Sequence, residues 1–287
     1  MSNTEDNLDR DPSWNTSVSD LLKGIYRCAD KSSWYDSVAL AYDRTRPRYP
    51  AEIMARMQEI VSFGAGKSVL EIGAGPGIVT LELAKFGAEL VSLEPSKSAW
   101  AIASDKCAAY TNVEVINTTF EDWDLASRKF DVVVAATSFH WILPEVRCVK
   151  TAAALKNGGF LVLLWNTPPQ PSREVHQSLE AVYQTYAPGL YKYEEHQDHQ
   201  QNIGKIAQSV INSGYFQDLT SDRQIVSVSY SIEAYLTLLS TLSPYIRLPE
   251  EQREALFMAL GQKLNQLTGD RHLDLSYLSL LQTARKS

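Results

Sequence analysis

The chain has 287 residues, 44% of them hydrophobic, and a formal net charge of -7. This length allows a large α/β domain with a sizeable core. The acidic balance argues against a nucleic-acid partner, which needs a field of Lys and Arg side chains. No apolar stretch approaches the roughly 20 residues of a membrane helix, and no secretory pattern opens the chain.

The cysteines are few and widely separated, at Cys28, Cys107 and Cys148. Their odd number and spacing fit neither a disulfide framework nor a C-x-x-C site. We therefore expect core thiols in a reducing compartment, and we predict a cytoplasmic protein.

The N-terminal third shows helical spacing of apolar residues, interrupted by Pro47 and Pro50. We predict an N-terminal helical extension over residues 1–33 and one domain over 34–287. The helical patterns of this region cover residues 18–27, 34–43 and 51–63.

From residue 67 onward, short apolar runs alternate with segments of helical spacing. Strands that are apolar throughout and alternate with helices form a parallel sheet covered on both faces. We therefore predict a doubly wound, mostly parallel α/β fold. The five buried strands are expected at residues 68–72, 89–93, 112–116, 130–136 and 159–165.

The C-terminal part has a looser texture. Residues 223–231 alternate like a strand and 274–284 resemble a last strand, which brings the predicted sheet to seven strands. We expect the other parts of 171–270 to form cap elements around the substrate mouth. His196 and His199 lie three residues apart in a polar stretch, which we interpret as solvated charge rather than as a metal site.

Three glycines, Gly73, Gly75 and Gly77, follow the first predicted strand in the stretch VLEIGAGPGIVTLELAKFGAELVSLEPS, residues 69–96. Glycine permits positive φ and allows a ligand to lie directly on the backbone. In open α/β sheets ligands bind beyond the carboxyl ends of the strands, where this loop falls. The dinucleotide fingerprint G-x-G-x-x-G needs a glycine where Ile78 stands, so the loop does not favour a pyrophosphate. A tight turn without a ligand remains an alternative.

Two acidic residues accompany this loop. Glu94 ends the second predicted strand and is followed by Pro95, so its carboxylate can accept both hydroxyls of a ribose. Glu71 ends an apolar run, where a carboxylate is costly unless it meets loop N–H groups or a ligand ammonium. A strand end that faces the surface is the alternative for Glu71.

These motifs resemble motif I and the acidic second-strand loop of class I S-adenosylmethionine-dependent methyltransferases. Residues 35–50, YDSVALAYDRTRPRYP, resemble the N-terminal lid of the small-molecule branch, which includes trans-aconitate methyltransferase-like proteins. The resemblance extends from about residue 34 to the end of the chain. Its other segments lie in family order at residues 118–123, 130–142 and 155–165.

The resemblance implies S-adenosyl-L-methionine as the cofactor. On the lid it implies that a tyrosine hydroxyl and a guanidinium bind the methionine carboxylate, although a plain amphipathic helix with a solvated turn would give the same spacing. Many relatives carry an aspartate where Thr119 stands, so Phe120 and Glu121 are expected to replace it at the adenine. The full cofactor set that the resemblance implies is Tyr35, Tyr42, Arg46, Glu71, Gly73, Ala74, Gly75, Gly77, Glu94, Pro95, Ser96, Thr119, Phe120, Glu121 and Ala136.

The acceptor side is expected at Phe139, His140, Trp141 and Trp165. His140 follows the fourth strand and is either the general base or a wall residue. Trp141 is expected to form a hydrophobic wall. No motif between residues 171 and 270 names the acceptor.

The sequence thus predicts a methyltransferase that acts on an O or N atom of a small organic molecule. The alternatives are lipid modification with the same cofactor, such as cyclopropane synthesis, and a nicotinamide oxidoreductase with a shortened glycine loop. A non-catalytic binding protein and a methyltransferase for tRNA or protein also remain open.

Overall fold

The computed structural model describes residues 35–269 and 272–287, and the extension expected at 1–33 lies outside them. The description that follows concerns the unit Ser32–Ser287 in its described part. Its helices are α3 (Ala39–Thr45), α4 (Ala51–Val61), α5 (Thr80–Ala84), α6 (Lys97–Cys107), α7 (Pro144–Ala154), α8 (Arg173–Ser178), α9 (Glu180–Tyr186), α10 (His196–Asn212), α11 (Ile232–Ser240), α12 (Ser243–Ile246) and α13 (Glu250–Thr268), with short 3-10 turns at Phe139–Trp141 and Pro188–Leu190.

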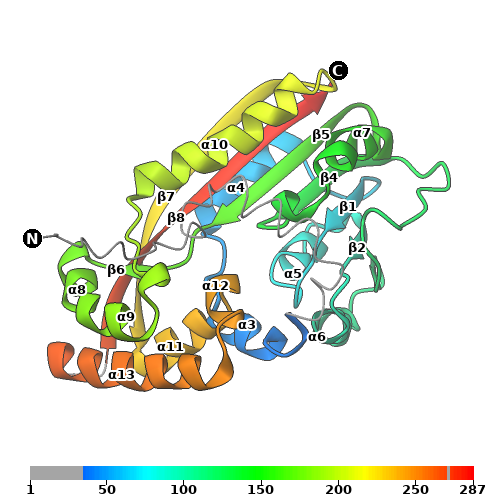
Figure 1. Ribbon diagram of the computed structural model, residues 1–287. Helices are drawn as coiled ribbons and strands as arrows, with labels where there is room; N and C mark the ends of the chain where they lie inside the picture. The colour runs from blue at the N-terminus through cyan, green and yellow to red at the C-terminus, as the bar shows by residue number, and fades with distance from the viewer. Residues whose placement is uncertain (1–34, 270–271) are drawn as a thin grey trace, which may run out of the picture. The chain divides into compact units, whose positions relative to one another are not determined.

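The strands form one sheet in the order β3-β2-β1-β4-β5-β8-β6, with β7 paired to β8 (Figure 1). The pairs among β1 to β5 are parallel, whereas β8 runs antiparallel to β5, β6 and β7. The doubly wound, mostly parallel prediction is therefore confirmed. In the described residues the sheet has eight strands rather than the seven expected, because β6 has only two residues and leaves no apolar pattern in the sequence. The bounds are β1 (Ser68–Ile72), β2 (Glu89–Leu93), β3 (Val113–Ile116), β4 (Phe130–Ala136), β5 (Leu155–Asn166), β6 (Gln170–Pro171), β7 (Phe216–Ser231) and β8 (His272–Lys286).

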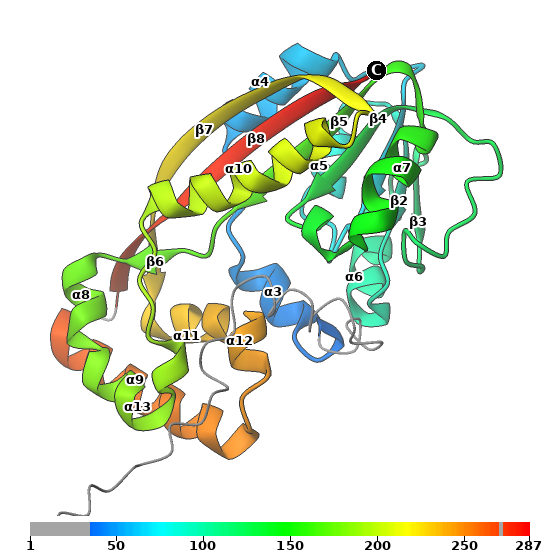
Figure 2. The ribbon, with the colours of Figure 1, turned by 45° about the horizontal axis from the view of Figure 1, so that its top comes forward.

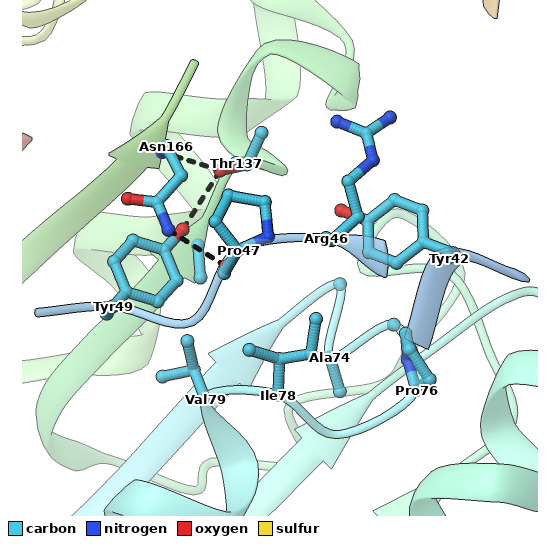
Figure 3. A pocket seen from close by; sticks show the side chains of 13 residues that line it. Tyr42, Arg46, Pro47, Tyr49, Ala74, Pro76, Ile78, Val79, Thr137 and Asn166 are labelled. Atoms are coloured by element: carbon cyan, nitrogen blue, oxygen red, sulfur yellow. Dashed lines mark hydrogen bonds between the residues drawn. The ribbon is translucent and has the colours of Figure 1, made fainter. Parts of the chain in front are cut away.

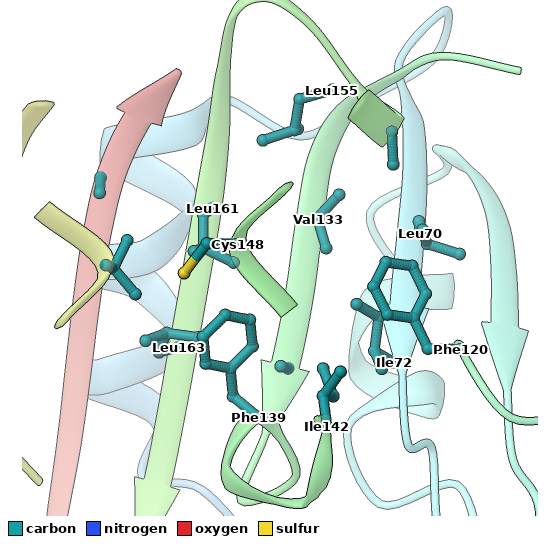
Figure 4. Close-up of a cluster of buried hydrophobic side chains, with 14 of the residues drawn as sticks. Leu70, Ile72, Phe120, Val133, Phe139, Ile142, Cys148, Leu155, Leu161 and Leu163 are labelled. Atoms are coloured by element: carbon teal, nitrogen blue, oxygen red, sulfur yellow. The ribbon is translucent and has the colours of Figure 1, made fainter. Parts of the chain in front are cut away.

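Helices cover both faces of the parallel part of the sheet. On one face α4 and α5 bury Met57 and Leu83 against Leu90 and Val162. On the other, α7 and α10 bury Cys148 and Val210 among side chains that include Leu70, Val133, Phe139 and Leu161 (Figure 4). Burying a large apolar side chain contributes about 1.5–3 kcal/mol, so these two layers hold the strands in register.

A separate group of helices stands at the end of the sheet where β1, β4 and β5 finish. Figure 2 shows α8, α9, α11 and α13 gathered in one group. They share a core around Leu238, Leu256 and Leu260, whose side chains are fully buried. Helix α3 contacts both α11 and α6. Helices α8, α9, α11 and α13 fall within residues 171–270, where cap elements are expected, and their role at a substrate mouth stays a prediction.

Helix α10 departs from that expectation. It packs along β7 and β8, and its Ile203, Ile206 and Val210 join the sheet core. Its polar sequence, HQDHQQNIGKIAQSVIN, hides one apolar stripe at helical spacing. Within residues 171–270 this helix therefore covers the sheet rather than the mouth.

Among residues 35–269 and 272–287, no helix combines the length and apolar character that crossing a bilayer demands.

Candidate functional site

The glycine loop lies between β1 and α5 and is fastened to β2. The N–H groups of Gly73 and Ala74 both donate to the carbonyl oxygen of Leu93, at 2.8 and 3.0 Å. Gly73, Gly75 and Gly77 have φ of 71°, 56° and 83°, in the region where only glycine is unstrained. The loop is thus a fixed, left-handed turn at the carboxyl end of the sheet.

Gly73 and Gly75 are required for different reasons. A Cβ on Gly73 would lie 2.6 Å from the Cβ of Ser138, so close packing excludes any side chain there. A Cβ on Gly75 would meet no atom within 4 Å. Gly75 therefore presents bare backbone to open space, as a surface that receives a ligand requires.

Glu94 turns its carboxylate toward this loop. Gly75 N donates to Oε2 and Ser96 N donates to Oε1, each at 2.7 Å. Only 7% of Glu94 is exposed, and this burial raises its pKa to about 7, while the two N–H groups act in the opposite direction. Each oxygen keeps further lone pairs that can accept hydroxyl hydrogens.

Glu71 lies beneath the loop and is fully buried, so the alternative of a surface-facing strand end is wrong. Its Oε2 accepts from Thr80 Oγ1 and Ser92 Oγ, both at 2.7 Å. Burial raises the pKa of this carboxyl, and the two hydroxyl donors counter it. Glu71 Oε1 has no hydrogen-bond partner in the described part of the chain.

The N-terminal segment crosses above the loop. Arg46 donates from Nε and Nη2 to Oγ1 and O of Thr241, at 2.9 and 3.0 Å, and lies 4.6 Å from the ring centroid of Tyr42. Within residues 35–269 and 272–287 its other N–H groups have no hydrogen-bond partner, and they can bind an anion. Tyr35 stands edge-on to Tyr42 and Trp141, and burial raises its pKa to about 12.

A pocket opens between this segment and the glycine loop (Figure 3). It contains six of the cofactor residues expected from the sequence. No carboxylate lines it. The lining residues are Tyr42, Arg46, Pro47, Tyr49, Gly73, Ala74, Gly75, Pro76, Ile78, Val79, Ala136, Thr137 and Asn166.

Sequence reasoning missed three polar residues of this pocket. The Tyr49 hydroxyl and Thr137 Oγ1 are 2.9 Å apart, and Asn166 Nδ2 donates to the carbonyl oxygens of Pro47 and Arg48 at 3.1 and 3.3 Å. Thr137 adopts φ of 53°, a strained conformation for threonine. The position of Thr137 and Asn166 directly after apolar strands was the available signal, because such positions meet at one edge of a parallel sheet.

The residues expected at the adenine occupy other surroundings. Thr119 Oγ1 donates to Asp122 Oδ2 at 2.7 Å, and Glu121 Oε1 accepts from Leu143 N at 3.0 Å. Phe120 is 3% exposed and packs in the sheet core, so it offers no open face for stacking. None of the three lines the pocket. Next to Glu94, Pro95 is exposed and Ser96 caps α6.

Two of the residues expected on the acceptor side lie in the core, and the other two pack against each other. Phe139 is fully buried and Trp165 is 4% exposed, with Nε1 donating to Gln282 Oε1 at 3.1 Å, so both lie in the core rather than at an open surface. The His140 ring packs 5.0 Å from Trp141 and 5.5 Å from Trp165, centroid to centroid. Its burial, together with the nearby Arg147, lowers the pKa of His140 to about 4. His140 is therefore neutral at pH 7.

The two histidines of the polar stretch have protein partners. His196 Nε2 lies 3.0 Å from Ser276 Oγ, and His199 Nδ1 lies 3.5 Å from Glu194 Oε2. Within the described ranges no group of three His, Cys, Asp or Glu side chains is arranged to hold a metal ion.

Residues 69–159 match a family model described as a methyltransferase domain. An uncharacterized methyltransferase of Mycobacterium tuberculosis is 31% identical over 138 residues, which cover 48% of this chain and 54% of that protein. The chain thus spans about half the length of the curated relative it matches.

Two solved structures show the same fold at low identity. The YcgJ protein of Bacillus subtilis is 14% identical with a TM-score of 0.52, covering 83% of this chain and 99% of that one. Phosphoethanolamine N-methyltransferase 2 of Haemonchus contortus, in complex with S-adenosyl-L-methionine, is 15% identical with a TM-score of 0.52, covering 91% of this chain and 60% of that one.

The chain has the Rossmann-like methyltransferase fold, and the segment that matches the methyltransferase domain model, residues 69–159, contains both the glycine loop and Glu94.

Proposed function

We propose that this chain is an S-adenosylmethionine-dependent methyltransferase that transfers a methyl group to an O or N atom of a small organic molecule. The single observation that carries the proposal is the Glu94 carboxylate, held by Gly75 N and Ser96 N beside bare glycine backbone. The lid-like segment 35–50 and the acidic net charge favour the small-molecule branch suggested by the trans-aconitate methyltransferase-like pattern.

The residues present fit the ribose and the methionine carboxylate of this cofactor. Glu94 has lone pairs free for a ribose diol, and the open space over Gly75 can receive a nucleoside on its backbone. Arg46 keeps unused N–H donors for the methionine carboxylate, in a pocket whose lining contains no competing acid. When bound, the cofactor supplies an electrophilic methyl group.

Positioning and the exclusion of water are the contributions of this chain's own residues. In-line displacement depends on alignment, for which a fixed geometry supplies several kcal/mol. The Tyr49–Thr137 contact and the Asn166 amide hold the segment 47–49 over the ends of β4 and β5. The Tyr35 and Trp141 rings pack edge to face, with centroids 5.9 Å apart. Exclusion of water from the site would favour a step in which charge is lost.

His140 supports a wall role better than a base role in this proposal. A base with a pKa of about 4 is neutral at pH 7 but too weak to deprotonate an alcohol or an ammonium group efficiently. Its ring instead lies against Trp141 and Trp165. We infer that acceptors enter with the nucleophilic lone pair already available.

Isothermal titration with S-adenosylhomocysteine and, separately, with NADH tests the proposal. We expect binding of S-adenosylhomocysteine in the micromolar range and none of NADH; the reverse result would reject the proposal in favour of the oxidoreductase alternative. Transfer of labelled methyl to a panel of amines, phenols, alcohols and carboxylates then separates an enzyme from a binding protein. Including tRNA and phospholipid vesicles in the panel tests the remaining alternatives.

A further inference from the structure

Asp36 lies outside the pocket, yet its carboxylate reaches the turn that follows Glu94. Asp36 Oδ1 accepts from Ser96 Oγ at 2.6 Å and from Ser98 N at 3.0 Å. These hydrogen bonds, that of Ser96 foremost, hold the pKa of Asp36 below its usual range. The group is therefore a carboxylate at neutral pH, and its charge strengthens both contacts.

Ser96 connects Asp36 to Glu94, the residue whose carboxylate is proposed to bind the ribose. Its N–H donates to Glu94 Oε1 at 2.7 Å, and its Oγ also accepts from Ala99 N at 3.2 Å as the cap of α6. With its hydroxyl both donating and accepting, and with 1% of the residue exposed, Ser96 has one orientation. The N–H that directs Glu94 is thus fixed from two sides, and one of these sides is the N-terminal segment.

A second clasp fastens the same segment elsewhere. Lys106, in the last turn of α6, pairs with Asp43 of α3 and also donates to the carbonyl oxygen of Pro76 at 3.1 Å. This clasp holds the segment against α6 and the glycine loop. It makes no hydrogen bond to Glu94 or to the turn 94–98, so it offers a matched comparison with Asp36.

We propose that Asp36 is a positioning residue for the cofactor: acting through Ser96, it keeps the Glu94 carboxylate oriented toward the ribose diol. This inference rests on the proposed function. As a consequence, the orientation of Glu94 toward the sugar depends on the position of the segment that carries Tyr42 and Arg46. Loss of Asp36 should therefore weaken recognition of the diol specifically, in addition to loosening the segment.

The test measures dissociation constants for two probes, S-adenosylhomocysteine and its 2′-deoxyribose counterpart, by isothermal titration. For Asp36→Ala we expect affinity for S-adenosylhomocysteine to fall about tenfold and affinity for the 2′-deoxy probe to fall less than threefold. Asp43→Ala, the control on the same segment, should weaken both probes by the same factor. Asp36→Asn keeps an acceptor oxygen in place and should restore most of the lost affinity.

Equal losses for the two probes in Asp36→Ala, or no loss at all, would overturn the inference while leaving the proposed function standing. Failure of the unsubstituted chain to bind S-adenosylhomocysteine would overturn the proposed function and the inference with it. Thermal melting of each variant shows whether the fold is intact, because Asp36 lies outside the buried core.

Discussion

Alanine at Gly73 should destabilise the fold, whereas alanine at Gly75 should leave it largely intact and weaken ligand binding. At Gly73 the new Cβ would lie 2.6 Å from the Cβ of Ser138. Ser138 cannot yield, because its Oγ donates to the carbonyl oxygen of Ile72 and its Cβ is bound directly to the backbone. The neighbouring strand end must shift instead.

The magnitudes separate the two variants. Both glycines have positive φ, which costs an alanine roughly 1–2 kcal/mol. Overpacking adds roughly 1–3 kcal/mol at Gly73 only, so its total is about 2–5 kcal/mol. At roughly 2–4 °C per kcal/mol for a domain of this size, Gly73→Ala should lower the melting temperature by about 4–20 °C and Gly75→Ala by about 2–8 °C.

Differential scanning calorimetry and titration with S-adenosylhomocysteine check the pair. Gly75→Ala should lose at least tenfold in affinity, because its methyl group would occupy the space assigned to the nucleoside. Equal melting temperatures for the two variants would refute the packing argument. Undiminished affinity in Gly75→Ala would refute the assignment of that space to a ligand.

Three further changes give expected outcomes. Affinity for S-adenosylhomocysteine should rise from pH 6 to 8, because the ribose diol donates to an ionised Glu94, whose pKa is raised to about 7. Glu94→Gln should make this affinity independent of pH. No pH dependence in the unsubstituted chain would contradict the contact between the diol and Glu94. The same raised pKa favours folding below the unfolded value of about 4.5, and this contribution is lost as pH rises through 7, which urea unfolding across pH measures. In turnover assays His140→Gln should lower kcat by less than tenfold with an unchanged profile from pH 6 to 9, whereas a loss above about a hundredfold would indicate a base. Phe139→Ala should cost about 3–5 kcal/mol of stability by thermal unfolding, and a purely ligand-binding defect would show that Phe139 is not a core residue.

The parallel half of the fold could be predicted closely from the sequence. The expected strands at 68–72, 89–93 and 130–136 coincide with β1, β2 and β4. These strands are buried on both faces, so each is an uninterrupted apolar run with sharp ends. A signal of this kind needs no knowledge of partners.

The antiparallel part of the sheet and the helix that covers it were harder to predict from the sequence. The strand expected at 223–231 in fact begins at Phe216. The sequence pattern missed its first part because the residues between are mostly polar and exposed, on a strand at the edge of the sheet. The polar stretch assigned to a cap contains α10, whose apolar stripe is only Ile203, Ile206, Val210 and their neighbours. In both cases burial on one side alone leaves a weak pattern.

In the candidate site, local features were predictable and assembled ones were not. Gly73, Gly75 and Glu94 could be recognised by their spacing along one short stretch of the sequence. Tyr49 and Thr137 meet only because the N-terminal segment folds back over the end of β4, and nothing in the sequence marks Thr137 for a positive φ. Tertiary placement therefore decided which polar groups line the pocket.

The position of β8 has a consequence for synthesis of the protein on the ribosome. Residues 160–166 of β5 and nearly all of β7 pair with β8, whose residues 272–286 are translated last of the three. Until then both strands expose unpaired N–H and C=O groups, and such edges are templates for aggregation. Nascent chains stopped before residue 272 should therefore depend on chaperones far more than chains that have completed this strand.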